Sequence, residues 1–123
     1  MALHESGQMY LEAIYVLLQR NEKIRAIDVG AYLGYTKPSV SRAIGLLKNS
    51  EHIMIDPEGY IRMTPKGEAF AEQLYERHTV LTGMLMALGV DEETATEDAC
   101  RIEHVISDSS FAAVKEHFLR FKK

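Results

Sequence analysis

Residues 27–63 are the segment that most constrains how the chain can fold. Residues 27–33 predict a short helix that ends at Gly34. Thr36 can cap a second helix, because its side chain can accept a hydrogen bond from a first-turn N–H and Pro38 is tolerated in that turn. Apolar residues at helical spacing predict the inward stripe of this second helix, namely Val40, Ile44 and Leu47. Two helices joined by a tight turn that contains glycine are typical of a helix-turn-helix.

Two short segments rich in apolar residues follow at once, over residues 53–55 and 60–63. Between them, Asp56, Pro57 and Gly59 suit the first, second and fourth positions of a type I turn, so we expect a β-hairpin. Helix, turn, helix and then hairpin is the order of a winged helix. Tyr60, beside the turn, is interpreted either as a phosphate contact or as a packing residue.

The other periodic segments predict helices over about residues 6–20, 64–88 and 91–107, with a last amphipathic helix closing the chain. The expected fold class is therefore mainly α with a small β-hairpin. We expect a winged helix-turn-helix over residues 1–75 and a second, helical domain over residues 76–123.

Charge is distributed unevenly, although the net charge of the whole chain is −4. Residues 20–48 contain six basic residues and two acids, whereas residues 91–108 contain seven acids and one arginine. The first region could face phosphates and the second could hold a cation, but both could equally be solvated helix faces.

Bulk features point to a protein without a membrane partner. Apolar runs are too short to span a bilayer, and the first residues show no basic head or apolar signal core, so we expect a cytoplasmic protein. The single cysteine cannot form an internal disulfide, which fits a reducing compartment.

The second helix of the helix-turn-helix has the side chains that a recognition helix needs near its N-terminus. Small polar and basic groups there can contact base edges and phosphates, and arginine can bind guanine through two hydrogen bonds. The expected DNA-binding residues are Thr36, Lys37, Pro38, Ser39, Ser41, Arg42 and Lys48. We expect Lys37 and Lys48 to contact phosphate. The alternative is an ordinary capped surface helix.

A second set of residues can bind metal. Cys100, Glu103 and His104 stand at i, i+3 and i+4, so a helix would place a thiol, a carboxylate and an imidazole on one face. One helix seldom supplies a complete coordination sphere, and further donors could come from Met9, Glu12 and His78 if the helices pack together. The alternatives are a buried cysteine, a core methionine and a surface Glu–His pair.

The chain resembles the diphtheria toxin repressor family of iron- and manganese-dependent transcription regulators over about residues 6–110. The motifs that carry the resemblance are Met9–Tyr15, Pro38–Ser41, Met63–Gly67, Arg77–His78 and, most specifically, Ala99–Ser107. The resemblance implies a metal-binding and dimerisation domain after the winged helix. It also implies a homodimer on a palindromic double-stranded DNA operator.

The resemblance also implies a mixed set of metal ligands. Met9, Cys100, Glu103 and His104 match the regulatory site of the iron sensors, whereas Glu12 and His78 look like ligands of the manganese sensors. The iron sensors' ancillary site uses donors where this chain has Thr82 and Thr96, so that version of the site is incomplete. The resemblance further implies the compact form of the family, without the SH3-like domain of the longer members.

Ligand chemistry favours Fe²⁺ over Mn²⁺, because a thiolate and a thioether replace two hard carboxylates. Zn²⁺, Co²⁺ and Ni²⁺ are expected to substitute in vitro.

The predicted function is a metal-dependent transcription repressor that controls metal homeostasis. The principal alternative is a metal-independent winged-helix regulator. A winged helix that binds only protein is disfavoured by the exposed Lys37 and Arg42. A small metalloenzyme is disfavoured because the chain has no His-Glu-x-x-His motif and no phosphate-binding glycine loop.

Overall fold

The computed structural model describes residues 3 and 5–121, which divide into two compact units over residues 1–72 and 73–123. The division falls within one helix, α4 (Pro65–Ala87). The expected fold class, mainly helical with a small hairpin, is confirmed. The domain boundary at residues 75 and 76 stays a prediction. Every helix in the described part of the chain is too short or too polar to span a lipid bilayer.

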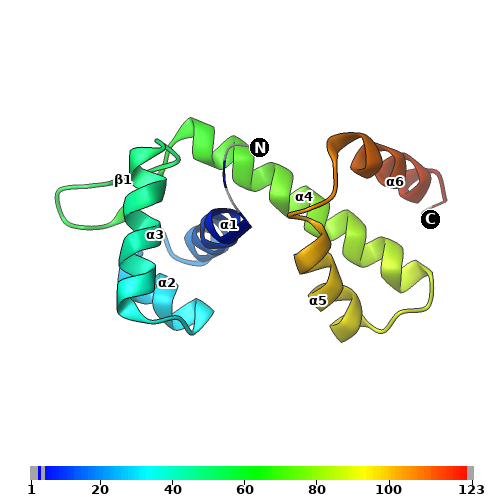
Figure 1. Cartoon of the computed structure of the whole chain (residues 1–123), viewed down its shortest axis with the longest axis horizontal. Coiled ribbons are helices and arrows are strands. Elements are labelled where there is room, and N and C mark those ends of the chain that lie inside the picture. The colour runs from blue at the N-terminus through cyan, green and yellow to red at the C-terminus, as the bar shows by residue number, and fades with distance from the viewer. Residues whose placement is uncertain (1–2, 4, 122–123) are drawn as a thin grey trace. The chain divides into compact units, whose positions relative to one another are not determined.

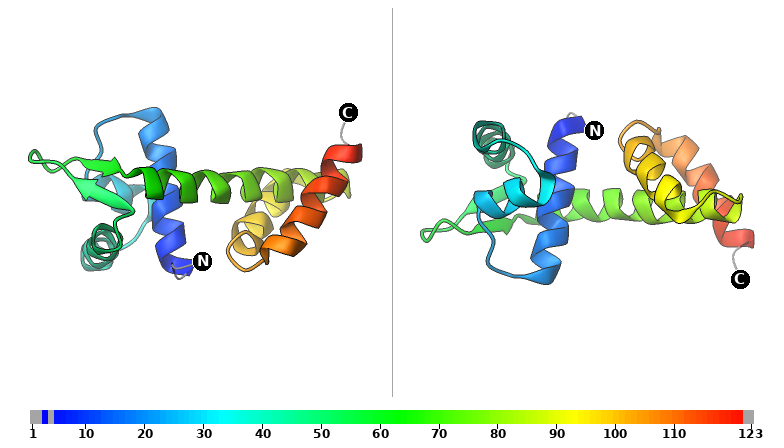
Figure 2. Two further views of the ribbon diagram at one scale, coloured as in Figure 1. Left: turned by 90° about the horizontal axis from the view of Figure 1, so that it is seen from above. Right: turned by 90° about the horizontal axis from the view of Figure 1, so that it is seen from below.

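Unit 1 is the winged helix (Figure 1). Its elements in chain order are α1 (Glu5–Arg20), α2 (Ala26–Leu33), α3 (Lys37–Asn49), β1 (Ile53–Ile55), β2 (Ile61–Met63) and the start of α4. The two strands are antiparallel, with Ile53 opposite Met63 and Ile55 opposite Ile61. In both views of Figure 2 the hairpin turn projects beyond the helices of this unit.

One apolar core holds unit 1 together. Leu11 and Ile14 of α1 are fully buried, and the predicted stripe of α3 is buried with them. The strands add Ile53 and Ile61, each at most 1% exposed. Burying side chains of this size stabilises the fold by about 1.5–3 kcal/mol each, so this core fixes the position of α3.

The turns of unit 1 form as their sequences predict. Thr36 caps α3, because its Oγ1 accepts the backbone N–H of Ser39 at 3.4 Å. In the hairpin, the Gly59 N–H donates to the Asp56 carbonyl at 2.9 Å, and Gly59 has a positive φ of 88°. The Asp56 carboxylate accepts the N–H groups of Glu58 and Tyr60 and contacts Arg62, and together these hold its pKa below the usual value.

Unit 2 comprises the rest of α4 with α5 (Glu92–Ile102) and α6 (Asp108–Phe121) (Figure 1). Helix α6 packs closely on α4 at Gly83, where a Cβ atom would lie 2.6 Å from the Phe118 ring. Asp91 is the N-cap of α5, and its carboxylate accepts the backbone N–H of Thr94 at 3.0 Å. Its buried residues are small, Ala95 and Ala99, which allows close packing.

Candidate metal centre and nucleic-acid interface

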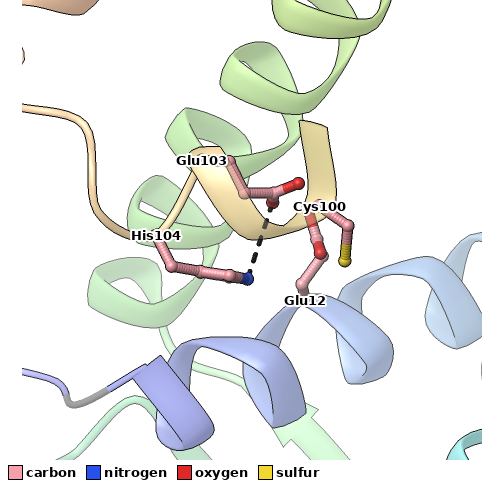
Figure 3. Close-up of side chains that lie close together, drawn as sticks. All are labelled: Glu12, Cys100, Glu103 and His104. Atoms are coloured by element: carbon pink, nitrogen blue, oxygen red, sulfur yellow. Dashed lines mark ion pairs between the residues drawn. The ribbon is translucent and has the colours of Figure 1, made fainter. Parts of the chain in front are cut away.

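The expected metal donors of unit 2 lie at the end of α5 and not within it. The prediction of a helix through residue 107 is wrong, because α5 ends at Ile102. Cys100 is in its last turn, Glu103 is the C-cap residue, and His104 lies in the turn that follows. Figure 3 shows these three side chains on the end of α5 and the segment after it.

A buried arginine explains why the helix stops there. Arg77 of α4, 5% exposed, donates from Nη1 to the carbonyls of Glu103 at 3.2 Å and Ile106 at 2.6 Å. Helix ends leave carbonyls without intrahelical partners. Arg77 satisfies the carbonyl of the C-cap residue Glu103 and also holds the carbonyl of Ile106, in the segment between α5 and α6. Ser107 then starts α6, because its Oγ accepts the backbone N–H of Ser110 at 3.1 Å.

The three donors remain close together despite this break. One ligand atom from each of Cys100, Glu103 and His104 lies within 4.8 Å of the other two. Atoms bound to one ion at about 2.0–2.3 Å lie up to roughly 4.5 Å apart, so small side-chain rotations would bring the three into one coordination sphere. The Glu103 side chain is fully buried and the His104 side chain is 5% exposed.

The buried carboxylate is held by His78 of α4. The His78 Nδ1 lies 2.8 Å from Glu103 Oε1, whereas the His104 Nε2 lies 4.0 Å from Glu103 Oε2. Each oxygen of Glu103 therefore faces a different imidazole. This contact gives His78 the position of a residue that orients a ligand carboxylate, as outer-shell partners do in metal sites. Its role as a direct ligand stays a prediction.

Met9 and Glu12 lie three residues apart on α1, in unit 1, where both are half-buried. Spacing of three residues places them on one face of that helix. The sulfur of Met9 accepts a hydrogen bond from the Tyr35 hydroxyl at 3.3 Å. Their part in a metal site stays a prediction.

The donor set fits a divalent transition metal. Thiolate and imidazole suit Fe²⁺, Co²⁺, Ni²⁺ and Zn²⁺, and the carboxylate also suits Mn²⁺. A buried carboxylate is costly to ionise unless a cation or hydrogen-bond donors face it. The chemistry of Cys100, Glu103 and His104 is therefore that of a cation site.

Most of the expected DNA-binding residues form an exposed surface on unit 1. The exposed members are Thr36, Lys37, Pro38, Ser41, Arg42 and Lys48. Ser39 differs, because it is half-buried and its Oγ accepts the Thr36 hydroxyl at 3.0 Å. Ser39 therefore takes part in the cap of α3. Contact of these residues with DNA stays a prediction.

Two pairings in the structure were not predicted from the sequence. Beside the hairpin turn, the Arg25 guanidinium lies 4.4 Å from the centre of the Tyr60 ring, and its hydrogen bond lowers the pKa of Tyr60. Tyr60 therefore packs against a cation. The second pairing is Arg77 with the end of α5. The Arg77–His78 motif marked this position in the sequence, but its carbonyl partners are 26 and 29 residues away.

Residues 64–123 match the family described as "Iron dependent repressor, metal binding and dimerisation domain". The transcriptional regulator MntR of Salmonella typhimurium is 33% identical over 104 residues, which are 85% of this chain and 66% of that protein. The HTH-type transcriptional regulator MntR of Bacillus pumilus is 32% identical over 105 residues, 85% of this chain and 73% of that protein.

Among solved structures, the manganese regulator SloR superimposes with a TM-score of 0.82 at 27% identity. The alignment covers all of this chain and 56% of SloR. This chain therefore spans slightly under two thirds of the Salmonella relative and little more than half of SloR. On the family match and these identities, the chain belongs to the diphtheria toxin repressor family of iron- and manganese-dependent regulators.

Proposed function

We propose that this chain is a metal-dependent transcription repressor whose affinity for operator DNA rises when Fe²⁺ or Mn²⁺ binds. The observation that carries the proposal is the convergence of a thiol, a buried carboxylate and an imidazole at the end of α5. The same chain presents a capped, basic α3 in a winged helix. The manganese regulator SloR is similar in structure, and the matching family is described as iron dependent.

The residues that would hold the ion are Cys100, Glu103 and His104, with Met9 and Glu12 as further ligands from α1. His78 would orient Glu103 and could itself become a ligand. When bound, the ion would supply positive charge and directed bonds that link α1 to the end of α5. Thiolate and thioether donors lead us to propose Fe²⁺ before Mn²⁺.

On the DNA side, α3 would enter the major groove, with Arg42 reading a base and Lys37 and Lys48 contacting phosphates. We propose a homodimer, in keeping with the dimerisation domain named in the matching family. Its two recognition helices would then read half-sites about 34 Å apart on a palindromic operator. A tenfold gain in DNA affinity on metal binding corresponds to a coupling free energy of about 1.4 kcal/mol, and DNA must tighten metal binding by the same factor.

The test uses the purified full chain and an operator selected from random duplexes in the presence of Mn²⁺ or Fe²⁺. Fluorescence anisotropy then measures DNA affinity with metal and with chelator. We expect Glu103→Gln and His104→Ala to abolish the metal-induced gain. Glu97→Gln makes the same change at an exposed position of α5 and serves as the matched control.

Arg42→Ala separates the two sites. It should weaken DNA binding by about 1–3 kcal/mol and relax base preference at one position, while metal affinity measured without DNA stays unchanged. DNA binding that is equally strong with chelator and with metal would refute metal dependence. That result would instead indicate the metal-independent winged-helix regulator.

A further inference from the structure

The Tyr35 side chain joins α1 to the beginning of the recognition helix. Tyr35 lies in the turn between α2 and α3, directly before the cap residue Thr36. Its hydroxyl donates to the Met9 sulfur at 3.3 Å, and its ring contacts the Tyr10 ring with centroids 5.7 Å apart. All of these groups belong to unit 1.

The hydrogen bond to Met9 is the part of this contact that can most easily change. A thioether is a weak acceptor, and Tyr35 is 44% exposed, so water can replace the sulfur as its partner. The backbone of Tyr35 is held independently, because its N–H donates to the Gly30 carbonyl at 3.2 Å. The hydroxyl can therefore change partner while the turn keeps its conformation.

Tyr35 also borders the surface expected to face DNA. It lines a groove between α2 and α3 together with Lys37 and Ser41, both of which are exposed. A tyrosine hydroxyl at this place can donate to a phosphate, as hydroxyl groups commonly do in protein–DNA complexes.

We propose that Tyr35 is a positioning residue that couples Met9 to DNA binding by exchanging its hydrogen-bond partner. The inference rests on the proposed function, specifically on Met9 as a metal ligand. A cation held by Met9 would make the sulfur a poorer acceptor and would place positive charge near the hydroxyl proton. The Tyr35 hydroxyl would then be free to leave Met9 and donate to a DNA phosphate beside Lys37.

Tyr35→Phe tests this exchange, because it removes the hydroxyl and keeps the ring that contacts Tyr10. Without DNA, Mn²⁺ or Co²⁺ affinity should rise by about two- to tenfold, since the metal no longer competes with a hydrogen bond. With metal, DNA affinity should fall by a similar factor, since the phosphate loses a donor. Tyr32→Phe makes the same change on an exposed tyrosine of α2 and should alter neither value.

A double-mutant cycle with Met9→Leu identifies the partner. In the Met9→Leu chain, Tyr35→Phe should leave metal affinity unchanged, because the competing sulfur is absent. A readout without metal comes from the NMR spectrum of methyl-labelled methionines. The Met9 methyl signal should shift in Tyr35→Phe and stay in place in Tyr32→Phe.

Three results would overturn the inference. They are unchanged metal affinity in Tyr35→Phe, an equal change in the Met9→Leu background, or an unmoved Met9 methyl signal. If any of them occurs while the unaltered chain still responds to metal, only the role of Tyr35 fails. If the unaltered chain itself shows no metal response, the proposed function fails, and the inference with it.

Discussion

Replacing Arg77 by methionine should destabilise unit 2 and weaken metal binding together. The guanidinium is buried and reaches two carbonyls, that of Glu103 at the end of α5 and that of Ile106 in the segment before α6. It also contacts the Asp108 carboxylate and lies 5.4 Å from the centre of the Phe111 ring. Methionine retains much of the apolar stem but none of these polar contacts.

The free energies expected for the separate contacts decide which one contributes most to stability. A hydrogen bond from a charged donor contributes about 1.5–3 kcal/mol, and losing it leaves a carbonyl without its partner. The Asp108 side chain is 93% exposed, so solvent screens its ion pair and the expected contribution is at most about 1 kcal/mol. The two carbonyl contacts therefore dominate, and the expected loss for Arg77→Met is about 3–6 kcal/mol in the free energy of unfolding.

Urea unfolding of the metal-free chain, followed by circular dichroism, measures this loss. Hydrogen exchange of the backbone amides assigns it to unit 2, where protection of α5 and the start of α6 should fall. Because Glu103 and His104 flank the carbonyl that Arg77 holds, Mn²⁺ affinity should fall by about 10–100-fold, as when other outer-shell partners are removed. Arg77→Lys should give intermediate losses of stability and of Mn²⁺ affinity, since lysine keeps the charge but lacks the planar guanidinium.

Asp108→Asn is the matched comparison, because it removes the ion pair and leaves both carbonyl contacts. Asp108→Asn should lower the free energy of unfolding by less than about 1 kcal/mol and leave metal affinity nearly unchanged. An Asp108→Asn loss as large as that of Arg77→Met would refute the assignment to the carbonyls. So would an Arg77→Met chain with normal metal affinity.

Two further predictions concern unit 1. Gly67→Ala should destabilise it by at least about 1–3 kcal/mol in urea unfolding, because a Cβ atom would lie 1.8 Å from the His52 carbonyl oxygen. Gly45→Ala, with open space around its Cβ, should instead add roughly 0.5–1 kcal/mol; losses of equal size at both glycines would contradict the steric explanation. Burial, aided by nearby Lys66, lowers the pKa of His52 below its usual 6.5. The neutral His52 side chain therefore contributes fully to stability above pH 6.5, and this contribution is lost as pH falls through the lowered pKa. The difference in unfolding free energy between the unaltered chain and His52→Gln should therefore shrink from about pH 8 to about pH 5, and a constant difference would show that His52 does not titrate in this way.

The winged helix could be predicted because its signals are local. Thr36 caps α3 through a residue three positions away, and Asp56 organises the hairpin turn through Glu58 and Tyr60. The apolar stripe of α3 needs only the helical period to be recognised. Each of these features depends on residues only a few positions apart, so the sequence alone predicts the elements and their order.

The end of α5 could not be predicted in the same way. Residues 103–107 carry no glycine or proline, so helical periodicity continues past the true end at Ile102. What ends the helix is a hydrogen-bond donor from α4 that lies distant in sequence, together with the Ser107 cap of the next helix. The side chains of Cys100, Glu103 and His104 nevertheless lie close together, because the C-cap residue Glu103 keeps nearly helical backbone angles, with φ −57° and ψ −26°.

The adjacent residues Arg77 and His78 of α4 both hold Glu103 at the end of α5. Consecutive residues on a helix point about 100° apart, so one turn of α4 can reach two different parts of the same neighbour. Arg77 binds the backbone carbonyl of Glu103, and His78 contacts the carboxylate of the same residue. Backbone and side chain of Glu103 are therefore fixed by one rigid element before any ion arrives. This pre-organisation lowers the conformational entropy lost on binding, which is why the two α4 residues should matter for metal affinity almost as much as the donors themselves.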